Sequence, residues 1–156
     1  GDREGSAVAC NFTMGRPFGS GRVARATGVL LAPTEAREQS FGAPMVVANH
    51  NLRQGHLAIA ASGGWAGPVA TALVVLALLE DGANLAAAMA VPRAARLGTG
   101  GPAFFEAGAE RSGGRKVSAL GRVQVLWCPD GLDRKPESCR FASDKRGYGL
   151  SLGQIF

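Results

Sequence analysis

Lysine and aromatic residues are scarce in this 156-residue sequence. Aromatic residues make up 6% of it, and arginine outnumbers lysine by 14 to 3 at a net charge of +5. The arginines are scattered along the chain, whereas a nucleic-acid interface concentrates basic residues on one face and interleaves them with aromatic ones. The sequence therefore predicts no nucleic-acid binding. Scattered arginines fit equally well a surface that contacts a larger, acidic partner.

Histidine is also rare, and the two histidines are His50 and His56. They lie at the ends of a predicted hairpin turn, and no acidic or thiol residue is near them in the sequence. A metal site needs a full set of such ligands. We therefore expect no metal site, and no motif indicates a cofactor.

A long hydrophobic run and a signal peptide are both missing. The longest apolar run, 69–79, is too short to span a bilayer and is followed by Glu80 and Asp81. Residues 1–5 contain no apolar core of the kind that a signal peptide requires. If the protein is exported, we expect its signal on another segment.

The sequence has only three cysteines. Cys128 and Cys139 flank a loop in which Pro129 and Gly131 let the chain double back and bring the two sulfurs together. We predict a disulfide between them, as expected in an oxidising compartment. The alternative is two free thiols in a cytosolic protein. Cys10 lies in an apolar alternation and is expected to be a small, buried hydrophobic residue.

Apolar residues, at 46%, and glycine, with 23 residues, are abundant. This is enough apolar mass for one domain over residues 1–156 with a sizeable core. The order of short strands, a hairpin, two helices and late strands predicts an α+β layer arrangement. The helix 65–79 is apolar nearly all round and should be buried on more than one side. The expected strands are 6–14, 29–31, 45–48, 56–61, 103–106, 117–127 and 148–152, and the expected helices are 65–79 and 84–91.

The junction between the strand 56–61 and the helix 65–79 contains Ser62, Gly63 and Gly64. Two glycines at a helix N-terminus leave backbone amides unobstructed, and the helix dipole adds positive potential there. Such a turn suits an oxyanion hole or an anion site. It equally suits a tight strand-to-helix turn whose backbone has no room for a Cβ atom. The sequence leaves both interpretations open.

Several short motifs, taken in order, resemble the small, C-terminal subunit of the γ-glutamyltransferase family, which belongs to the N-terminal-nucleophile (Ntn) hydrolases. No single motif is decisive, but their common order and spacing make the resemblance specific as far as about Arg96. The motifs are 4–9 (EGSAVA), 12–15 (FTMG), 18–21 (FGSG), 28–31 (GVLL), 61–64 (ASGG) and 90–93 (AVPR).

The resemblance implies an αββα four-layer sandwich of the Ntn-hydrolase type, completed by a partner chain, the large N-terminal subunit cut from the same precursor. It implies self-cleavage that exposes an N-terminal threonine, expected just upstream of Gly1. The threonine hydroxyl attacks a γ-glutamyl amide such as glutathione, or another acyl amide, and its own α-amine acts as general base. Thr13 matches a second threonine that supports the nucleophile. Gly63 and Gly64 match the backbone donors to the oxyanion, and the expected location is periplasmic or secreted.

The chain departs from the family where the γ-glutamyl group is recognised. Gly1 has no side chain that could attack a substrate, and Gly15 stands where the family has a substrate-contacting asparagine. Ser40 is the one serine kept from the motif that binds the glutamyl carboxylate. Glu35 is the one carboxylate placed to hold the glutamyl amine, and Arg37 beside it has the wrong charge for that task.

Two hypotheses follow from these similarities and departures. The first is a γ-glutamyltransferase-like hydrolase or transferase with altered acyl specificity. The alternative is a catalytically inactive structural subunit of a larger periplasmic complex, with other periplasmic proteins as partners. A stand-alone binding domain would require the chain to fold without a partner, which the resemblance argues against.

Overall fold

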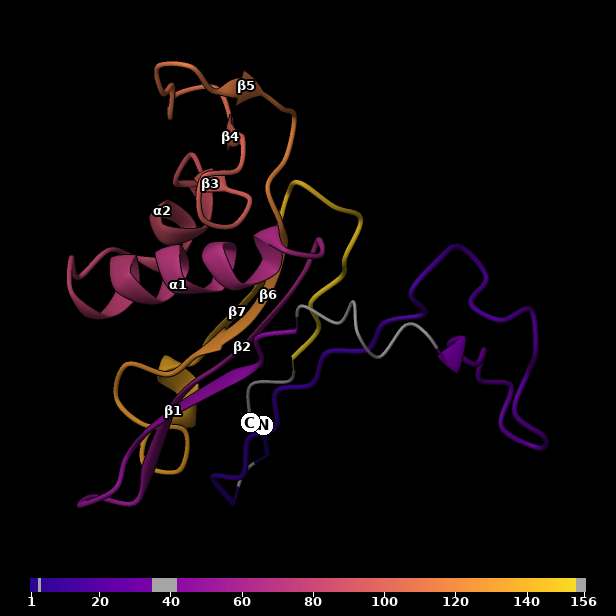
Figure 1. The fold of residues 1–156 in the computed structure, drawn as a ribbon. Coiled ribbons are helices and arrows are strands. Elements are labelled where there is room, and N and C mark those ends of the chain that lie inside the picture. The colour runs from indigo at the N-terminus through magenta and orange to yellow at the C-terminus, as the bar shows by residue number, and fades with distance from the viewer. Residues whose placement is uncertain (3, 35–41, 154–156) are drawn as a thin grey trace.

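The structure is a computed structural model that describes residues 1–2, 4–34 and 42–153. Its elements form a four-stranded sheet, a three-stranded sheet and a small number of helices (Figure 1). The predicted mixed α+β class is confirmed.

The larger sheet is antiparallel and has the strand order β1-β2-β6-β7. β1 (Met45–Asn49) and β2 (Gln54–Ser62) form the predicted hairpin, because a polar, glycine-containing stretch between two apolar runs turns the chain back. β6 (Arg122–Trp127) pairs with β2, and β7 (Arg140–Ser143) pairs with β6. β6 occupies only the second half of the range predicted for it.

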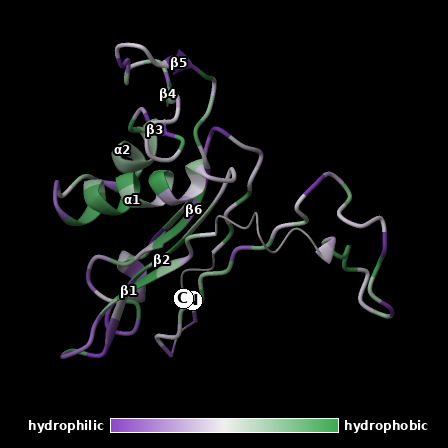
Figure 2. Ribbon diagram, in the orientation of Figure 1, coloured by the Kyte–Doolittle hydropathy of each residue, from purple (hydrophilic) through white to green (hydrophobic). Residues whose placement is uncertain are grey.

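Helices cover one face of this sheet. α1 (Ala66–Leu79) lies across it, and α2 (Leu85–Ala90) packs beside α1 (Figure 1). Side chains on alternate positions of β2, including Leu57 and Ile59, point to this face and form a core with Val74 of α1. Figure 2 shows the apolar residues concentrated in α1 and in the strands beneath it.

Both predicted helices are confirmed within a residue or two of their expected ends. α2 begins after Asn84, whose side chain accepts a hydrogen bond of 2.9 Å from the amide of Ala87. α1 is buried against the sheet and α2, whereas Leu76 and Leu79 on its outer side are exposed. No helix among the described residues is both long enough and apolar enough to cross a membrane.

The smaller sheet lies beyond α2. It contains β3 (Ala94–Arg96), β4 (Ala103–Phe105) and β5 (Arg115–Lys116), of which only β4 falls at a predicted strand. The aromatic ring of Phe104 packs against that of Trp65, just ahead of α1, with ring centroids 5.3 Å apart. This contact ties the smaller sheet to the N-terminus of α1.

Cys128 and Cys139 form the predicted disulfide. It links the residue after β6 to the residue before β7, and the loop between them contains a short 3-10 helix, η2 (Pro136–Ser138). Cys10 is exposed, so its predicted burial is wrong. Its segment lies over the sheet with alternate side chains turned outward, and Cys10 is on the outward side.

The structure contains no strand at 6–14 or at 148–152, although the sequence predicts both. The two segments lie on the sheet face opposite the helices. Within the described part of the chain, the backbones of residues 7–12 and 148–152 bond to no other backbone. A strand is defined by a hydrogen-bonded neighbour, so an alternating side-chain pattern alone does not make one.

Residues 15–34 form an arm that extends away from the rest of the chain (Figure 1). The predicted strand at 29–31 is reduced to a single bridge between Val23 and Leu30. Several apolar side chains of the arm, Phe18 and Val29 among them, are exposed. The arm therefore contributes little to the core.

Candidate functional site

The turn between β2 and α1 is built by glycine. Gly63 has a φ of 116° and Gly64 a φ of 59°, conformations that side chains with a Cβ atom rarely adopt. A Cβ atom on Gly63 would lie 2.7 Å from the Cα atom of Gly121, whereas one on Gly64 would meet nothing within 4 Å. Gly63 is thus required for both conformation and space, and Gly64 for conformation alone.

Gly121 supports this turn from behind. It precedes β6, has a φ of 72°, and packs so closely on α1 that a Cβ atom there would lie 2.7 Å from the Cβ atom of Ala70. The backbones of Gly63 and Gly121 are in direct contact, so neither can move closer to the other. The close approach of Gly63 and Gly121 therefore fixes the position of the turn.

The backbone amides of Gly63 and Gly64 point to no acceptor among the described residues, and both glycines are exposed. Trp65 caps α1 without a side-chain hydrogen bond. The first turn of a helix carries unsatisfied amides and the positive end of the helix dipole. The turn is therefore both a tight connection and a place where an anionic oxygen could be bound, so the two interpretations of the sequence are compatible.

Asn11 joins the N-terminal segment to this end of the sheet. Its side-chain amide donates a hydrogen bond to the carbonyl oxygen of Ala61, in the last part of β2. Thr13 follows two residues later, is exposed, and accepts a hydrogen bond of 3.0 Å from the amide of Gly15. Among the described residues no hydrogen bond joins Thr13 to Gly63 or Gly64.

Sequence reasoning missed a buried ionic network behind the turn. Arg93 is 1% exposed and donates to Asp144 at 2.7 Å and to the carbonyl of Gly121 at 3.1 Å. Asp144 in turn accepts from the amide of Val123 at 3.1 Å. Charged groups remain buried only where they are paired and hydrogen-bonded. Through Gly121, this network helps to position the turn that contains Gly63.

The second half of the network joins α2 to the loop after β7. Arg146 binds Glu106 through two bonds of 2.8 and 2.7 Å and also binds Asp144 at 3.2 Å. Its guanidinium donates to the carbonyls of Met89 and Val91 at 2.9 Å each. Four parts of the chain that are distant in sequence are held together by this one cluster.

The network also shifts the acidities of its members. Burial raises the pKa of Glu106 and of Asp144, but hydrogen bonds from Arg146, from backbone amides and from Arg93 outweigh it and hold both pKa values below the usual range. Both carboxylates are therefore ionised at neutral pH. Of the residues in this network, only Arg93 belongs to a motif that the sequence analysis identified. Asp144, its partner in the ion pair, lies 51 residues away, and no sequence pattern connects the two.

Other predicted positions contribute less. Ser40 and Glu35 lie outside the described residues. His56 contacts the carbonyl of Cys128 at 3.0 Å, and His50 lies in the hairpin turn. In the part of the chain that the structure describes, no group of three or more histidine, cysteine or acidic residues is placed to hold a metal ion.

Comparison with known proteins gives a likeness in structure. No protein-family model and no curated protein matches the chain in sequence. The γ-glutamyltranspeptidase of Pseudomonas nitroreducens complexed with L-DON superposes with a TM-score of 0.75 at 19% identity, over 99% of this chain and 96% of that one. The transpeptidase CapD of Bacillus anthracis gives 0.71 at 20%, over 98% and 96%. A mutant γ-glutamyltranspeptidase of Helicobacter pylori gives 0.68 at 17%, over 94% and 97%. The chain therefore shares the fold of these solved γ-glutamyltranspeptidase and transpeptidase chains.

Proposed function

We propose that this chain is the small subunit of a γ-glutamyltransferase-like enzyme that transfers or hydrolyses acyl amides. The observation that carries the proposal is the turn at Gly63 and Gly64, with exposed backbone amides at the N-terminus of α1, in a chain with the fold of γ-glutamyltranspeptidases. The partner is a large subunit from the same precursor. Glutathione and related γ-glutamyl amides are the first substrates to consider.

The chemistry follows from this arrangement. The hydroxyl of an N-terminal threonine upstream of Gly1 attacks the amide carbonyl, and its α-amine takes the hydroxyl proton. The carbonyl oxygen becomes an oxyanion, which the amides of Gly63 and Gly64 bind. Collapse expels the amine, which takes that proton, and leaves an acyl-enzyme. Water or an amino-acid amine then releases the acyl group.

The residues that would recognise the acyl group of the substrate differ from those of the γ-glutamyltransferase family. Gly15 has a φ of 71° in a loop and carries no side chain to contact a glutamyl group. Because recognition residues differ, an amide other than a simple γ-glutamyl one also fits the proposal. The disulfide between Cys128 and Cys139 favours a periplasmic or secreted location.

The first test determines the mature N-terminus of the subunit in the purified protein, by intact mass and N-terminal sequencing. A threonine a few residues ahead of Gly1 supports the proposal. A mature terminus at Gly1, or an upstream residue other than threonine, serine or cysteine, rules the mechanism out and leaves the inactive structural subunit.

Turnover is the second test. The protein, purified with its partner chain, is incubated with γ-glutamyl-p-nitroanilide, glutathione and a set of other acyl amides. Release of the amine from at least one of them is the expected result. An intact complex that releases none would contradict the enzymatic function.

A further inference from the structure

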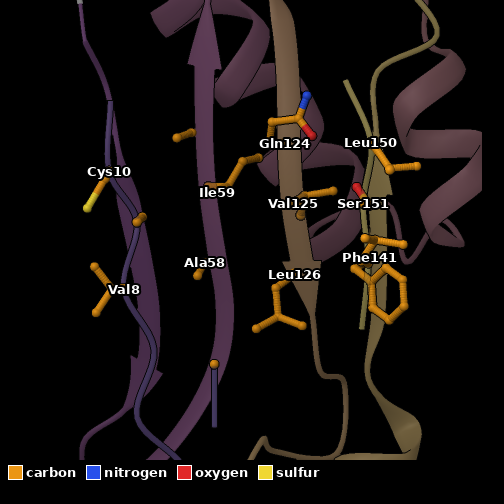
Figure 3. A pocket seen from close by; sticks show the side chains of 14 residues that line it. Val8, Cys10, Ala58, Ile59, Gln124, Val125, Leu126, Phe141, Leu150 and Ser151 are labelled. Atoms are coloured by element: carbon orange, nitrogen blue, oxygen red, sulfur yellow. The ribbon is translucent and has the colours of Figure 1, made fainter. Parts of the chain in front are cut away.

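The hollow on the face of the larger sheet opposite the helices has no charged side chain. Figure 3 shows it between Val8 and Cys10 on one side and Leu150 and Ser151 on the other, and its volume is about 320 Å³. None of the described residues that line it carries a charged side chain. Small-molecule sites gain specificity from a few well-placed polar or charged groups. The chemistry of this hollow therefore selects no charged ligand.

A second hollow, with different chemistry, lies on the smaller sheet. Its volume is about 340 Å³, which falls within the range of small-molecule sites. Alanines of β3 and β4 line this pocket, together with Arg96 at the end of β3. Arg111 and Ser112 line it from the loop that follows β4. The pocket therefore combines small apolar side chains with two guanidinium groups and a hydroxyl.

One face of the smaller sheet forms the floor of the pocket. Ala94 and Arg96 are two residues apart in β3, and Ala103 of β4 is opposite Arg96, so all three side chains point to the same face. The loop that leads to β5 lies over this face. A Cβ atom on Gly114 of that loop would be 2.8 Å from the ring of Phe105, which is opposite Ala94. A floor below and a loop above suit a small molecule better than an extended chain.

The two guanidinium groups use few of their hydrogen-bond donors within the protein. Arg96 donates a bond of 2.7 Å to the carbonyl oxygen of Gly101, and Arg111 donates one of 3.3 Å to the carbonyl oxygen of Glu110. The carboxylate of Glu110 accepts from the amide of Gly108 instead. Among the described residues, no ion pair involves either arginine. Since a guanidinium has several N–H groups, both side chains keep donors for an anionic ligand.

The turn between β3 and β4 holds Arg96 in place. The amide of Leu97 donates to the carbonyl oxygen of Pro102 at 3.1 Å. A Cβ atom on Gly101 would collide with the carbonyl oxygen of Leu97, so the turn closes only with glycine there. This close approach brings the carbonyl oxygen of Gly101 to the guanidinium of Arg96. The side chain of Arg96 is therefore oriented before a ligand arrives, which lowers the entropy cost of binding.

We infer that this pocket binds a small organic carboxylate. The guanidinium groups of Arg96 and Arg111 pair with the carboxylate, because planar guanidinium groups match its two oxygens and are weakly hydrated. The hydroxyl of Ser112 is a further donor. The alanines contact the apolar body of the ligand, since their small side chains leave space above the sheet. The inference rests on the smaller sheet and does not depend on the proposed acyl transfer.

Fluorine NMR tests the site with 4-(trifluoromethyl)benzoate as the probe, which has a carboxylate on a flat apolar ring. The purified protein is used together with any partner chain that it carries. The uncharged match of the probe is 4-(trifluoromethyl)benzamide, and acetate supplies the carboxylate without the ring. Broadening of the benzoate signal measures its dissociation constant, and acetate is added as a competitor.

Arg96→Gln and Arg111→Gln each remove one guanidinium group from the pocket. Arg115→Gln is the matched control, because Arg115 is exposed and does not line the pocket. It is opposite Phe104 in β5, so its side chain lies on the other face of the same sheet. All three substitutions change the net charge equally. Circular dichroism checks the fold of each variant, and if one pocket variant does not fold, the other is decisive.

We expect each pocket variant to weaken benzoate binding by about tenfold, the effect of losing one charged hydrogen-bonding partner. The control should weaken it by less than about twofold, because an exposed charge on the other face is screened. The benzamide and acetate should each bind about tenfold more weakly than the benzoate.

Equal weakening by all three substitutions would overturn the inference, since only the overall charge would then matter. Benzamide or acetate binding as tight as that of the benzoate would also overturn it. So would the absence of benzoate binding to the folded protein at about 10 mM. A protein that binds the benzoate in this pattern and turns over no acyl amide would keep this site and lose the proposed function.

Discussion

At the scale of single residues, the two glycines of the β2–α1 turn are not equivalent. The sequence shows them as a pair, but only Gly63 touches another backbone, that of Gly121. This difference could not be predicted, because Gly121 lies far along the chain in a segment with no motif. It allows the structural and the chemical roles of the turn to be separated by mutation.

Gly63→Ala should destabilise the protein by about 3 kcal/mol or more, since the new methyl group overlaps the Gly121 backbone and φ is unfavourable. Gly64→Ala should cost about 1–2 kcal/mol, because only the left-handed conformation is strained. Chemical denaturation of both variants checks this difference. Similar losses for the two would show that Gly121 does not restrict the turn.

The buried carboxylates make stability dependent on pH. Glu106 and Asp144 have pKa values below the usual range in the folded protein, so the folded state loses stability as the pH falls. The loss should begin near the unfolded pKa values, at about pH 4, and continue toward the lower folded values. Thermal unfolding between pH 2 and pH 7 measures it.

Asp144→Asn should flatten that pH dependence. It should also cost about 3 kcal/mol at neutral pH, because Arg93 stays buried and charged without its partner. Asp130→Asn is the matched control, since it removes an exposed ion pair with Lys135 and should change little. An Asp144→Asn protein as stable as the control would refute the structural role of the network.

At the scale of helices and strands, the sequence predicted the elements that depend on neighbouring residues. The hairpin, both helices and the disulfide follow from turn residues, an N-cap, apolar runs and a loop that doubles back. The strands β3, β5 and β7 escaped prediction because they are only two to four residues long, too short for an alternating pattern to show. The two predicted strands at 6–14 and 148–152 have the right pattern but no hydrogen-bonded neighbouring strand among the described residues.

Asn84→Ala tests the prediction that Asn84 caps the N-terminus of α2. Loss of the hydrogen bond to Ala87 should destabilise the protein by about 1 kcal/mol. Asn51→Ala, in the exposed hairpin turn, should change the free energy of unfolding by less than about 0.5 kcal/mol. Equal effects of the two substitutions in denaturant titrations would show that α2 does not depend on its cap.

At the scale of the whole molecule, apolar side chains of the described residues remain uncovered in several places, among them the arm, the outer side of α1 and residues 148–152. Their exposed members include Phe18, Leu76 and Leu150. Contiguous exposed apolar surface marks interaction sites. The resemblance in sequence predicts a partner chain, and we propose that it packs on some of these exposed surfaces.

The chain alone should therefore self-associate, while a complex with the proposed large subunit should be monodisperse. Sedimentation and dye binding to apolar surface, measured on both samples, test this expectation. A well-folded monomer of the isolated chain that binds no dye would argue against a partner and for an independent domain.

The contact between Trp65 and Phe104 gives the protein an internal optical probe. The chain has two tryptophans, and the other, Trp127, lies at the far end of β6 from the glycine turn. In a Trp127→Phe variant, emission would come from Trp65 alone, two residues from Gly63. Its intensity and wavelength would then report occupation of the turn in real time, without any label and without a chromogenic substrate.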